Sequence, residues 1–436
     1  MTEETPTRPV SAFQHGALAL LRSRTALWCA FAVSQVWLVF LNLIVVPGGF
    51  NDVSVVYRYW AQQALVENYW VGINGDWVYP IVALVPIMLA AVFGLPAYSV
   101  TWLALVVVLN AMALFVVQSF RRRAAVSAGW WWIIFMVCLG PISQSRIDAI
   151  TVPVAIIAVT WFAARPRVAT ILLTAATWIK IWPIALLGAL VIATRQRVAV
   201  MVTAISTSLA IIALALAAGS GATVLSFITQ HTGRGLQVES PAATFWVWQT
   251  ALGVPGAAIY YDTGILTYQV TGAGTAVMAA VTTPLLAVVV LGICALGAFA
   301  VARGVSAMLL SPLLGLAIVT ALIVVNKVGS PQFISWLAVP IVWGLAATLQ
   351  GTESASSSTP FRIPAALAIV IAILTQLIYP FLYDAVILAE PLMLAVLGVR
   401  NLLLLALLGW SVYKIGQLNR AHHARGKLET TPTLRE

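Results

Sequence analysis

The most chemically suggestive residue of the sequence is Asp52, which directly follows the first long apolar run. A carboxylate at such a place could act as a general base and take a proton from a hydroxyl group. The residues after it predict an amphipathic helix lying in the membrane interface, because one arc carries the apolar side chains of Val53, Val56, Tyr57, Trp60 and Ala64. Asp52 would lie at the N-terminus of this helix, where the helix dipole favours a carboxylate, so capping is an equal alternative.

Basic residues in apolar or turn segments are candidates for binding an anion. Lys180 lies between two tryptophans in the sequence WIKIWP. A lysine at membrane depth costs several kcal/mol unless it has a partner or a water-filled cavity, so we expect a phosphate near it in preference to a structural ion pair. The other candidate cations are Arg146, Arg234 and Lys327. For Arg146, a local ion pair with Asp148 that closes a turn is the slightly favoured interpretation over anion binding.

Further polar residues gather in segments that we expect outside the membrane. Asp76 follows an Asn-Gly pair and could be a second carboxylate of the site, although a turn-forming role is the favoured interpretation. The segment 326–332 (NKVGSPQ) separates two apolar runs with more polar groups than a plain turn needs. His231 has no second histidine near it, so we expect no metal site.

Composition bounds the class of protein. The chain has 436 residues, of which 61% are hydrophobic and 8% charged, whereas a soluble domain carries roughly a quarter charged residues. This excludes a cytosolic enzyme, a nucleic-acid-binding protein and a disordered scaffold. The length allows roughly ten to thirteen membrane crossings. The three cysteines lie in apolar runs without a CxxC pair, so neither a disulfide framework nor a zinc site is indicated.

The placement of charge predicts the topology. The net charge of +10 comes largely from basic clusters between apolar runs, and these should face the cytoplasm. Residues 79–93 are then too short for a span and form an interfacial or re-entrant segment, while 168–193 form two half-depth helices that meet at Lys180. We expect full spans at about 26–46, 97–119, 126–141, 147–163, 198–217, 274–300, 304–324, 333–349, 364–381 and 394–413.

The predicted fold is an all-α, polytopic membrane helical bundle. It contains about 11–12 transmembrane or half-membrane helices and an extracytoplasmic amphipathic helix in the first loop. A cytoplasmic N-terminal tail (1–25) and a basic cytoplasmic tail (414–436) flank the membrane domain (26–413). External loops at about 47–96 and 218–272 hold much of the polar chemistry, which places the site at the extracytoplasmic face.

The order of these motifs resembles the C-superfamily of integral-membrane glycosyltransferases. The closest resemblance is to glycosyltransferase family 87, the actinobacterial enzymes that use polyprenyl-phosphate sugars and include phosphatidylinositol-mannoside mannosyltransferases. Many relatives have Tyr-Pro-Pro where Ile81 follows Pro80 here, which leaves the sugar and the acceptor open. The resemblance rests on Asp52-Val53 with Tyr57, Tyr79-Pro80, Lys180 with Pro183, Arg234 with Glu239-Ser240, and Asn326–Gln332.

The resemblance implies a cell-membrane enzyme that moves one sugar, in the first place mannose, from a polyprenyl-phosphate donor to a glycolipid or lipoglycan. Asp52 would be the general base of an inverting reaction that needs no cofactor and no metal. The cations Lys180, Lys327, Arg234 and Arg146 would bind the donor phosphate. Substrate contacts are expected from Tyr57, Tyr59, Asp76, Tyr79, Gln237, Glu239 and Gln332.

Other functions remain open at this level. A flippase or transporter of lipid-linked sugar would also need polar groups in a membrane bundle, but such proteins place their sites at the midplane and often contain inverted repeats. The sequence has one broken hairpin, no repeat, and polar residues weighted to one face. An arabinofuranosyltransferase and a catalytically silent subunit of the same fold are further alternatives.

Overall fold

The computed structural model describes residues 23–119, 123–230, 233–347 and 361–429. Most of the predicted N-terminal tail and the last residues of the predicted C-terminal tail lie outside these ranges. Within them the chain is an all-α bundle of a multi-pass membrane protein, because eight helical segments are long and apolar enough to cross a membrane. The helices of these segments are α2 (Arg24–Phe40), α5 (Tyr98–Gln118), α6 (Arg123–Leu139), α10 (Arg197–Ala217), α13 (Thr275–Ala302), α14 (Ala307–Val324), α16 (Arg362–Gln376) and α18 (Pro391–Glu429).

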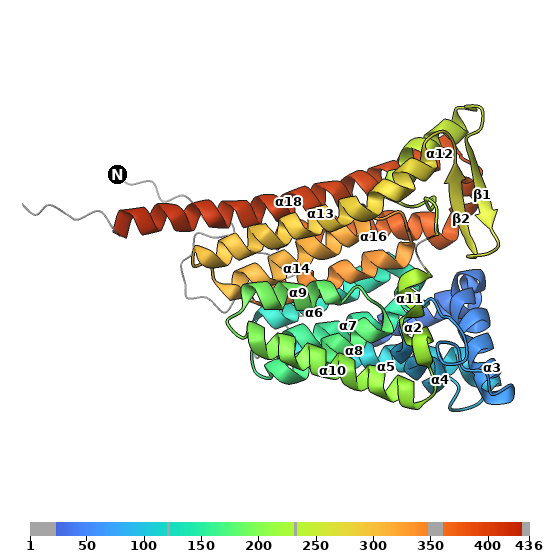
Figure 1. Cartoon of the computed structure of the whole chain (residues 1–436), viewed down its shortest axis with the longest axis horizontal. Helices are drawn as coiled ribbons and strands as arrows, with labels where there is room; N and C mark the ends of the chain where they lie inside the picture. The colour runs from blue at the N-terminus through green and yellow to red at the C-terminus, as the bar shows by residue number, and fades with distance from the viewer. Residues whose placement is uncertain (1–22, 120–122, 231–232, 348–360, 430–436) are drawn as a thin grey trace, which may run out of the picture.

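Four shorter apolar helices complete the bundle, and two of them form the predicted broken pair. The helix α8 runs towards the middle of the bundle and α9 returns from it (Figure 1). At 1.5 Å per residue, the 14 residues of α8 rise about 21 Å, which is less than the roughly 30 Å hydrocarbon core. The four are α7 (Asp148–Trp161), α8 (Pro166–Ile179), α9 (Ile184–Ala193) and α15 (Ala338–Ala347). The prediction of full spans at about 147–163 and 333–349 is therefore wrong, because the apolar helices at these places are shorter than a full span.

The break between α8 and α9 has a local cause. Pro183 has no backbone N–H and disfavours helical geometry in the residue before it, so a continuous helix cannot pass through this segment. Lys180 takes an extended conformation at the end of α8. Trp182 packs face to face on Trp336, with ring centroids 5.4 Å apart. The predicted pair of half-depth helices is therefore confirmed, with Lys180 at the turn.

The first loop contains the predicted amphipathic helix, but its apolar side faces protein. A π-helical segment, Asp52–Tyr57, continues into α3 (Arg58–Val66). Val53, Tyr57 and Ala64 are buried, as the arc predicts. Tyr57 packs on Trp102 of α5 instead of on lipid headgroups. The short apolar stretch that follows contains a 3-10 turn (Ile81–Ala83) and the short helix α4 (Leu84–Leu89), which confirms that it is no full span.

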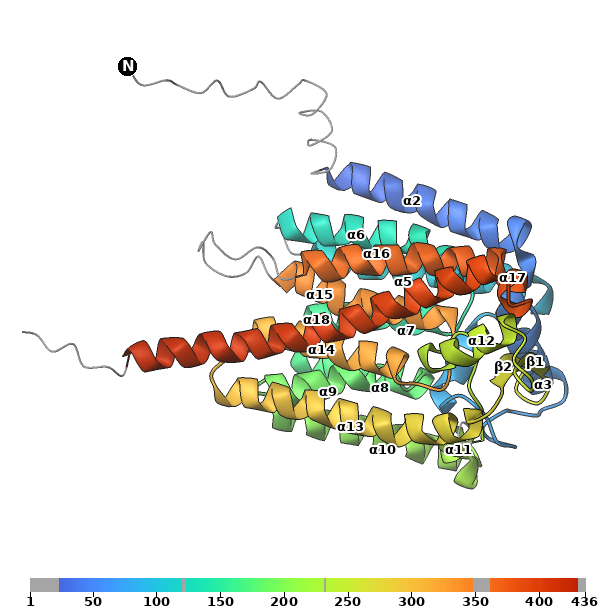
Figure 2. The same ribbon diagram turned by 90° about the horizontal axis from the view of Figure 1, so that it is seen from above.

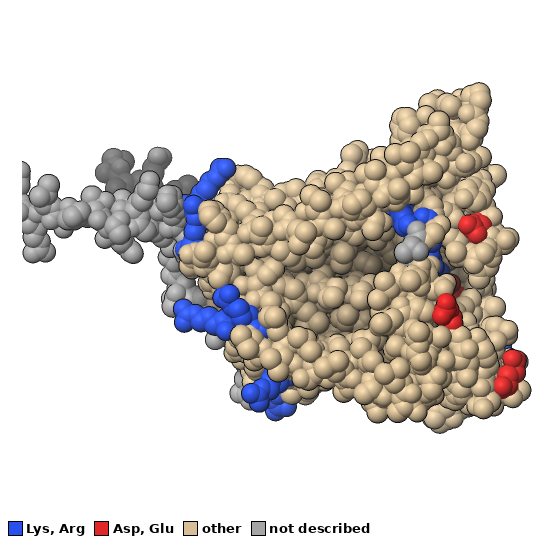
Figure 3. Space-filling model, viewed as in Figure 1, with Lys and Arg blue, Asp and Glu red and all other residues tan. Residues whose placement is uncertain are grey.

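The two ends of the bundle differ in chemistry. One end, which we call the hairpin end, carries the antiparallel strands β1 (Ala258–Asp262) and β2 (Thr267–Thr271), the only strands among the described residues. The turns at the opposite end carry Arg165, Arg195 and Arg303, and we call it the basic end. Figure 3 shows Lys and Arg gathered there, and Asp and Glu towards the hairpin end. Three short helices also lie at the hairpin end (Figure 2): α11 (Ser226–Thr229), α12 (Thr244–Ala251) and α17 (Tyr383–Ile387).

The main hydrophobic core joins the central helices α6, α7, α9, α14, α15 and α16. A second cluster packs the first loop onto α5 and the start of α7. A third joins the β-hairpin and α12 to the start of α18. The polar segments at the hairpin end are therefore fixed on a packed scaffold.

The last helix is longer than expected. The predicted span at about 394–413 is part of α18, which continues to Glu429 and extends past the basic end of the bundle (Figure 2). The residues 414–429 of the predicted tail are thus helical. Alanine, leucine, lysine and glutamine in this stretch have good helix propensity, so the helix does not end where the apolar residues do.

Candidate functional site

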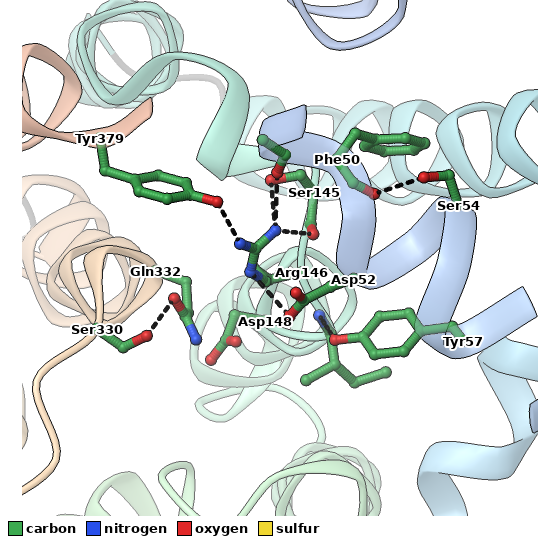
Figure 4. A network of polar contacts seen from close by, with 12 residues as sticks. Phe50, Asp52, Ser54, Tyr57, Ser145, Arg146, Asp148, Ser330, Gln332 and Tyr379 are labelled. Carbon is green, nitrogen blue, oxygen red and sulfur yellow. Dashed lines mark hydrogen bonds and ion pairs between the residues drawn. The ribbon is translucent and has the colours of Figure 1, made fainter. Parts of the chain in front are cut away.

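The candidate general base, Asp52, forms an ion pair that the sequence did not indicate. Its Oδ2 lies 3.0 Å from Nε of Arg146, and the side chain of Asp52 is 37% exposed to solvent. Arg146 also donates to the carbonyl oxygens of Gly49 and Ser145, at 2.9 and 2.8 Å, and to the hydroxyl of Tyr379 at 2.8 Å. Figure 4 shows the guanidinium between these groups. Arg146 therefore fixes the carboxylate of Asp52 in place.

The capping alternative for Asp52 is not what the structure contains. Asn51 occupies the N-cap position without a side-chain cap bond, and the carboxylate of Asp52 turns to Arg146. In the described residues, Oδ1 of Asp52 has no hydrogen-bond donor. One oxygen is therefore held while the other remains accessible, which is the arrangement a general base requires.

A second ion pair lies at the tip of the broken hairpin. Nζ of Lys180 is 2.9 Å from Oδ2 of Asp148, which is itself almost fully buried. The other oxygen of Asp148 accepts a hydrogen bond of 2.6 Å from the indole of Trp336. Thus the expected local pair between Arg146 and Asp148 does not form, because each residue has a partner on another element. Lys180 therefore has a structural ion-pair partner, which its sequence context favoured less than a phosphate.

Two tyrosines connect the two ion pairs. The hydroxyl groups of Tyr57 and Tyr79 lie 3.3 Å apart, and Tyr57 accepts a bond from the backbone N–H of Ile147. The ammonium group of Lys180 lies 5.6 Å from the centre of the Tyr79 ring. Burial, the neighbouring Tyr79 and the Asp52 carboxylate raise the pKa of Tyr57 well above its ordinary value. The Tyr57 hydroxyl thus stays neutral and can donate a proton in a hydrogen bond.

Arg234 and Lys327 form a second cationic group at the hairpin end. Burial lowers the pKa of Lys327, and the nearby charge of Arg234 lowers it further. Burial also lowers the pKa of Arg234, although Tyr79 and Asp262 oppose this shift. Nε of Arg234 is buried and has no hydrogen-bond partner within the described ranges. Two cations that repel each other, one of them with an unsatisfied donor, are suited to binding an anion.

Glu239 and Gln237, which were predicted as substrate contacts, are buried and have partners within the protein. Glu239 is 2% exposed and pairs at 2.7 Å with Arg400, a residue of α18. Its carboxylate is enclosed by protein and already has its cation. Gln237 is 4% exposed, and its backbone N–H donates to the carbonyl of Lys327. The bond from Gln237 joins the loop that carries Arg234 to the loop that carries Lys327.

The other residues predicted to contact substrate lie at different distances from the pair of Asp52 and Arg146. Gln332 is beside Arg146 and Asp148 and accepts a hydrogen bond from Ser330 (Figure 4). Tyr59 is exposed on the outer side of α3, where it accepts a bond from Gln63. Asp76 is exposed and accepts a 3.3 Å bond from Gln230, so it links two loops at the edge of the site.

Three residues that pair with the candidate site residues could not be identified from the sequence. Tyr379 and Trp336 lie in apolar runs, where an aromatic residue is ordinarily read as core or belt. Arg400 lies inside the last span, and its depth was a signal that it has a buried partner. That signal does not say which carboxylate pairs with it, because Glu239 is distant in sequence.

Figure 3 shows a depression in the surface between α13 and α10. Charged side chains gather at the end of this depression that lies nearest the hairpin end. Among the described residues, no three His, Cys, Asp or Glu side chains lie close enough together to hold a metal ion. No protein-family model, curated protein or solved structure matches the chain. The geometry and chemistry of these residues are therefore the basis for any functional proposal.

Proposed function

We propose that the protein is a glycosyltransferase of the membrane-embedded type. It transfers one sugar, mannose in the first place, from a polyprenyl-phosphate donor to a glycolipid or lipoglycan acceptor. The observation that supports this most strongly is the carboxylate of Asp52, held by Arg146 at 3.0 Å and still partly exposed. Lys180, Arg234 and Lys327 lie at the same end of the bundle and supply positive charge.

In the proposed reaction, an acceptor hydroxyl attacks the anomeric carbon of the donor sugar. The bond between this carbon and the donor phosphate oxygen breaks, and the hydroxyl proton moves to Asp52. The leaving group is a polyprenyl phosphate monoester, on which negative charge develops. Fixed cations stabilise such charge where water is excluded, so Arg234 and Lys327 are the proposed phosphate ligands. Attack from the face opposite the phosphate inverts the anomeric configuration.

Of the four cations expected to bind the donor phosphate, Arg146 and Lys180 are given other roles here. Arg146 donates hydrogen bonds to three other residues of the protein and forms an ion pair with Asp52. Lys180 pairs with Asp148, so both cations have protein partners before any sugar donor binds. Arg146 is proposed as the residue that positions Asp52. Lys180 is close enough to Asp52 to interact electrostatically, and it can turn a remaining N–H towards a phosphate.

The proposed orientation follows from the distribution of charge. Basic residues are retained on the cytoplasmic side of membrane proteins, so the basic end and both termini would face the cytoplasm. The hairpin end, with Asp52, would face the extracytoplasmic side. A lipid-linked donor would then enter from the outer leaflet.

The direct test is to incubate membranes that contain the protein with polyprenyl-phosphate mannose and, separately, with polyprenyl-phosphate arabinose. Mass analysis of the lipid products would show which sugar is transferred. We expect a product one hexose heavier than its acceptor with the mannose donor. Movement of the labelled donor between leaflets without any transfer would instead favour the flippase alternative.

A further inference from the structure

A second polar site lies at the basic end, far from Asp52. A hollow of about 690 Å³ opens where the turn before α8 meets the turn before α10. Its lining includes the three arginines Arg165, Arg167 and Arg195 and no acidic residue. All three side chains are exposed. The hollow therefore concentrates positive charge at a point where the bundle meets the polar edge of the membrane.

Within the described part of the chain, these arginines have no acidic partner. None of the ion pairs among the described residues includes them. Arg165 lies 5.9 Å from the centre of the Trp161 ring, a contact that leaves its guanidinium N–H groups available. Three guanidinium groups around one hollow can bind phosphate oxygens through several hydrogen bonds at once.

An apolar groove adjoins the hollow. It has a volume of about 410 Å³ and is lined by α8, α9 and α10. The two cavities meet on α10, where Ala199 lines the hollow and Val200 lines the groove. An added Cβ atom at Gly188 of α9, another lining residue, would meet nothing within 4 Å. The groove is thus open along the surface of a helix, α10, that is mostly exposed to lipid.

The length of the groove fits one leaflet. From Val200 to Leu209 the axis of α10 rises about 14 Å at 1.5 Å per residue, close to half of the roughly 30 Å hydrocarbon core. An acyl chain whose headgroup lies at the arginines would end near the middle of the bilayer. A polyprenyl donor whose phosphate lies near Lys327 would have its charged group at the opposite end of the bundle.

We propose that the hollow and the groove together bind one anionic phospholipid from the leaflet at the basic end. The arginines contact the phosphate headgroup and the groove holds an acyl chain between α8, α9 and α10. Basic pockets between transmembrane helices on the cytoplasmic side recognise anionic lipids through this combination of charge and apolar surface. The site is independent of glycosyl transfer, because none of its residues belongs to the cluster around Asp52.

The test uses purified protein in detergent and measures lipid binding by native mass spectrometry. It compares the binding of phosphatidylglycerol with that of phosphatidylcholine that has the same acyl chains. The first variant is R165Q/R195Q. Its matched control, R303Q/R362Q, removes the same charge at the same end but outside the hollow. A second variant, Gly188→Leu, fills the groove and leaves every arginine in place.

We expect the wild-type protein to bind phosphatidylglycerol more tightly than phosphatidylcholine. Each arginine near a membrane surface contributes about fivefold in affinity, so R165Q/R195Q should weaken phosphatidylglycerol binding by roughly 25-fold. The control should bind like the wild type, and Gly188→Leu should reduce binding of both lipids at the site. Equal binding of the two lipids by wild type would overturn the proposal. So would equal losses in both double variants, or displacement of phosphatidylglycerol by polyprenyl phosphate.

Discussion

Nε of Arg146 lies 3.0 Å from Oδ2 of Asp52, and this pair joins the start of α7 to the loop that follows α2. The remaining contacts of the guanidinium go to Gly49, Ser145 and Tyr379. Since these groups come from three separate segments, Arg146 sets their relative positions. In the proposed reaction its effect would reach the substrate through Asp52.

Replacing Arg146 should therefore affect turnover more than donor binding. Arg146→Lys keeps the charge but cannot reproduce the planar fork that reaches several acceptors at once. We expect a lower kcat with little change in the KM for the polyprenyl-phosphate donor. Steady-state kinetics with varied donor concentration would measure both values.

Arg58→Gln is the matched control, because Arg58 is an exposed cation of the same loop. It should leave kcat and KM unchanged. If Arg146→Lys instead raised KM and kept kcat, Arg146 would bind the donor phosphate directly, as the sequence first indicated.

The pair between Lys180 and Asp148 predicts a stability effect. Asp148→Asn leaves a lysine at membrane depth without its carboxylate, and removing one partner of a buried ion pair costs about 3–5 kcal/mol. We expect a clear drop in the melting temperature of the purified protein. Thermal unfolding followed by intrinsic tryptophan fluorescence would measure it.

The double variant D148N/K180M separates this effect from general damage to the fold. It removes both charges, so much of the lost stability should return. If the double variant were as unstable as the sum of the two single variants, the ion pair would not be the cause.

The lowered pKa of Lys327 predicts a dependence of donor binding on pH. A lysine whose pKa is lowered loses its positive charge at a lower pH than an ordinary lysine. The KM for a phosphate-bearing donor should therefore rise as pH increases, beginning below the ordinary range for lysine. Initial rates at several donor concentrations over a pH series would show the trend.

Lys327→Arg should move this rise to higher pH, because guanidinium stays protonated to about pH 12 or above. Lys327→Met should have a high KM with little pH dependence. An unchanged pH profile in both variants would assign the donor phosphate to other cations.

The pair between Glu239 and Arg400 is predicted to be structural. Both side chains are almost fully buried, so Glu239→Gln should destabilise the protein by about 3–5 kcal/mol. In the fraction that remains folded, the KM for the acceptor should be unchanged. A rise in that KM at normal stability would restore Glu239 as a substrate contact.

Most of the fold could be predicted because membrane helices carry their signal locally. Apolar length and basic clusters placed eight of the ten expected spans, and the helices at the other two places, α7 and α15, are shorter than a full span. Pro183 with Lys180 located the break between α8 and α9. The end of α18 could not be found in this way, since polar residues with good helix propensity extend it. The apolar arc after Asp52 was correct, but an arc does not say whether lipid or α5 covers it.

The site was harder to predict because its pairs are not local. The sequence singled out Asp52, Arg146 and Lys180 as residue types out of place in their segments. It could not show that Arg146 turns to Asp52 and leaves Asp148 to Lys180, because tertiary packing decides between nearby alternatives. Arg400 satisfies Glu239 from a helix far along the chain, and no spacing rule predicts that contact.

The most direct test of the proposed reaction compares wild type with Asp52→Asn in single-turnover transfer from a saturating polyprenyl-phosphate donor. Asparagine keeps the shape of the side chain but cannot accept the proton, so the rate should fall by roughly 10²–10⁴-fold. Donor affinity should stay the same, and Glu67→Gln, which removes an exposed carboxylate from the same loop, should transfer at the wild-type rate. A correctly folded Asp52→Asn protein that transfers sugar as fast as wild type would contradict the assignment of Asp52 as the base.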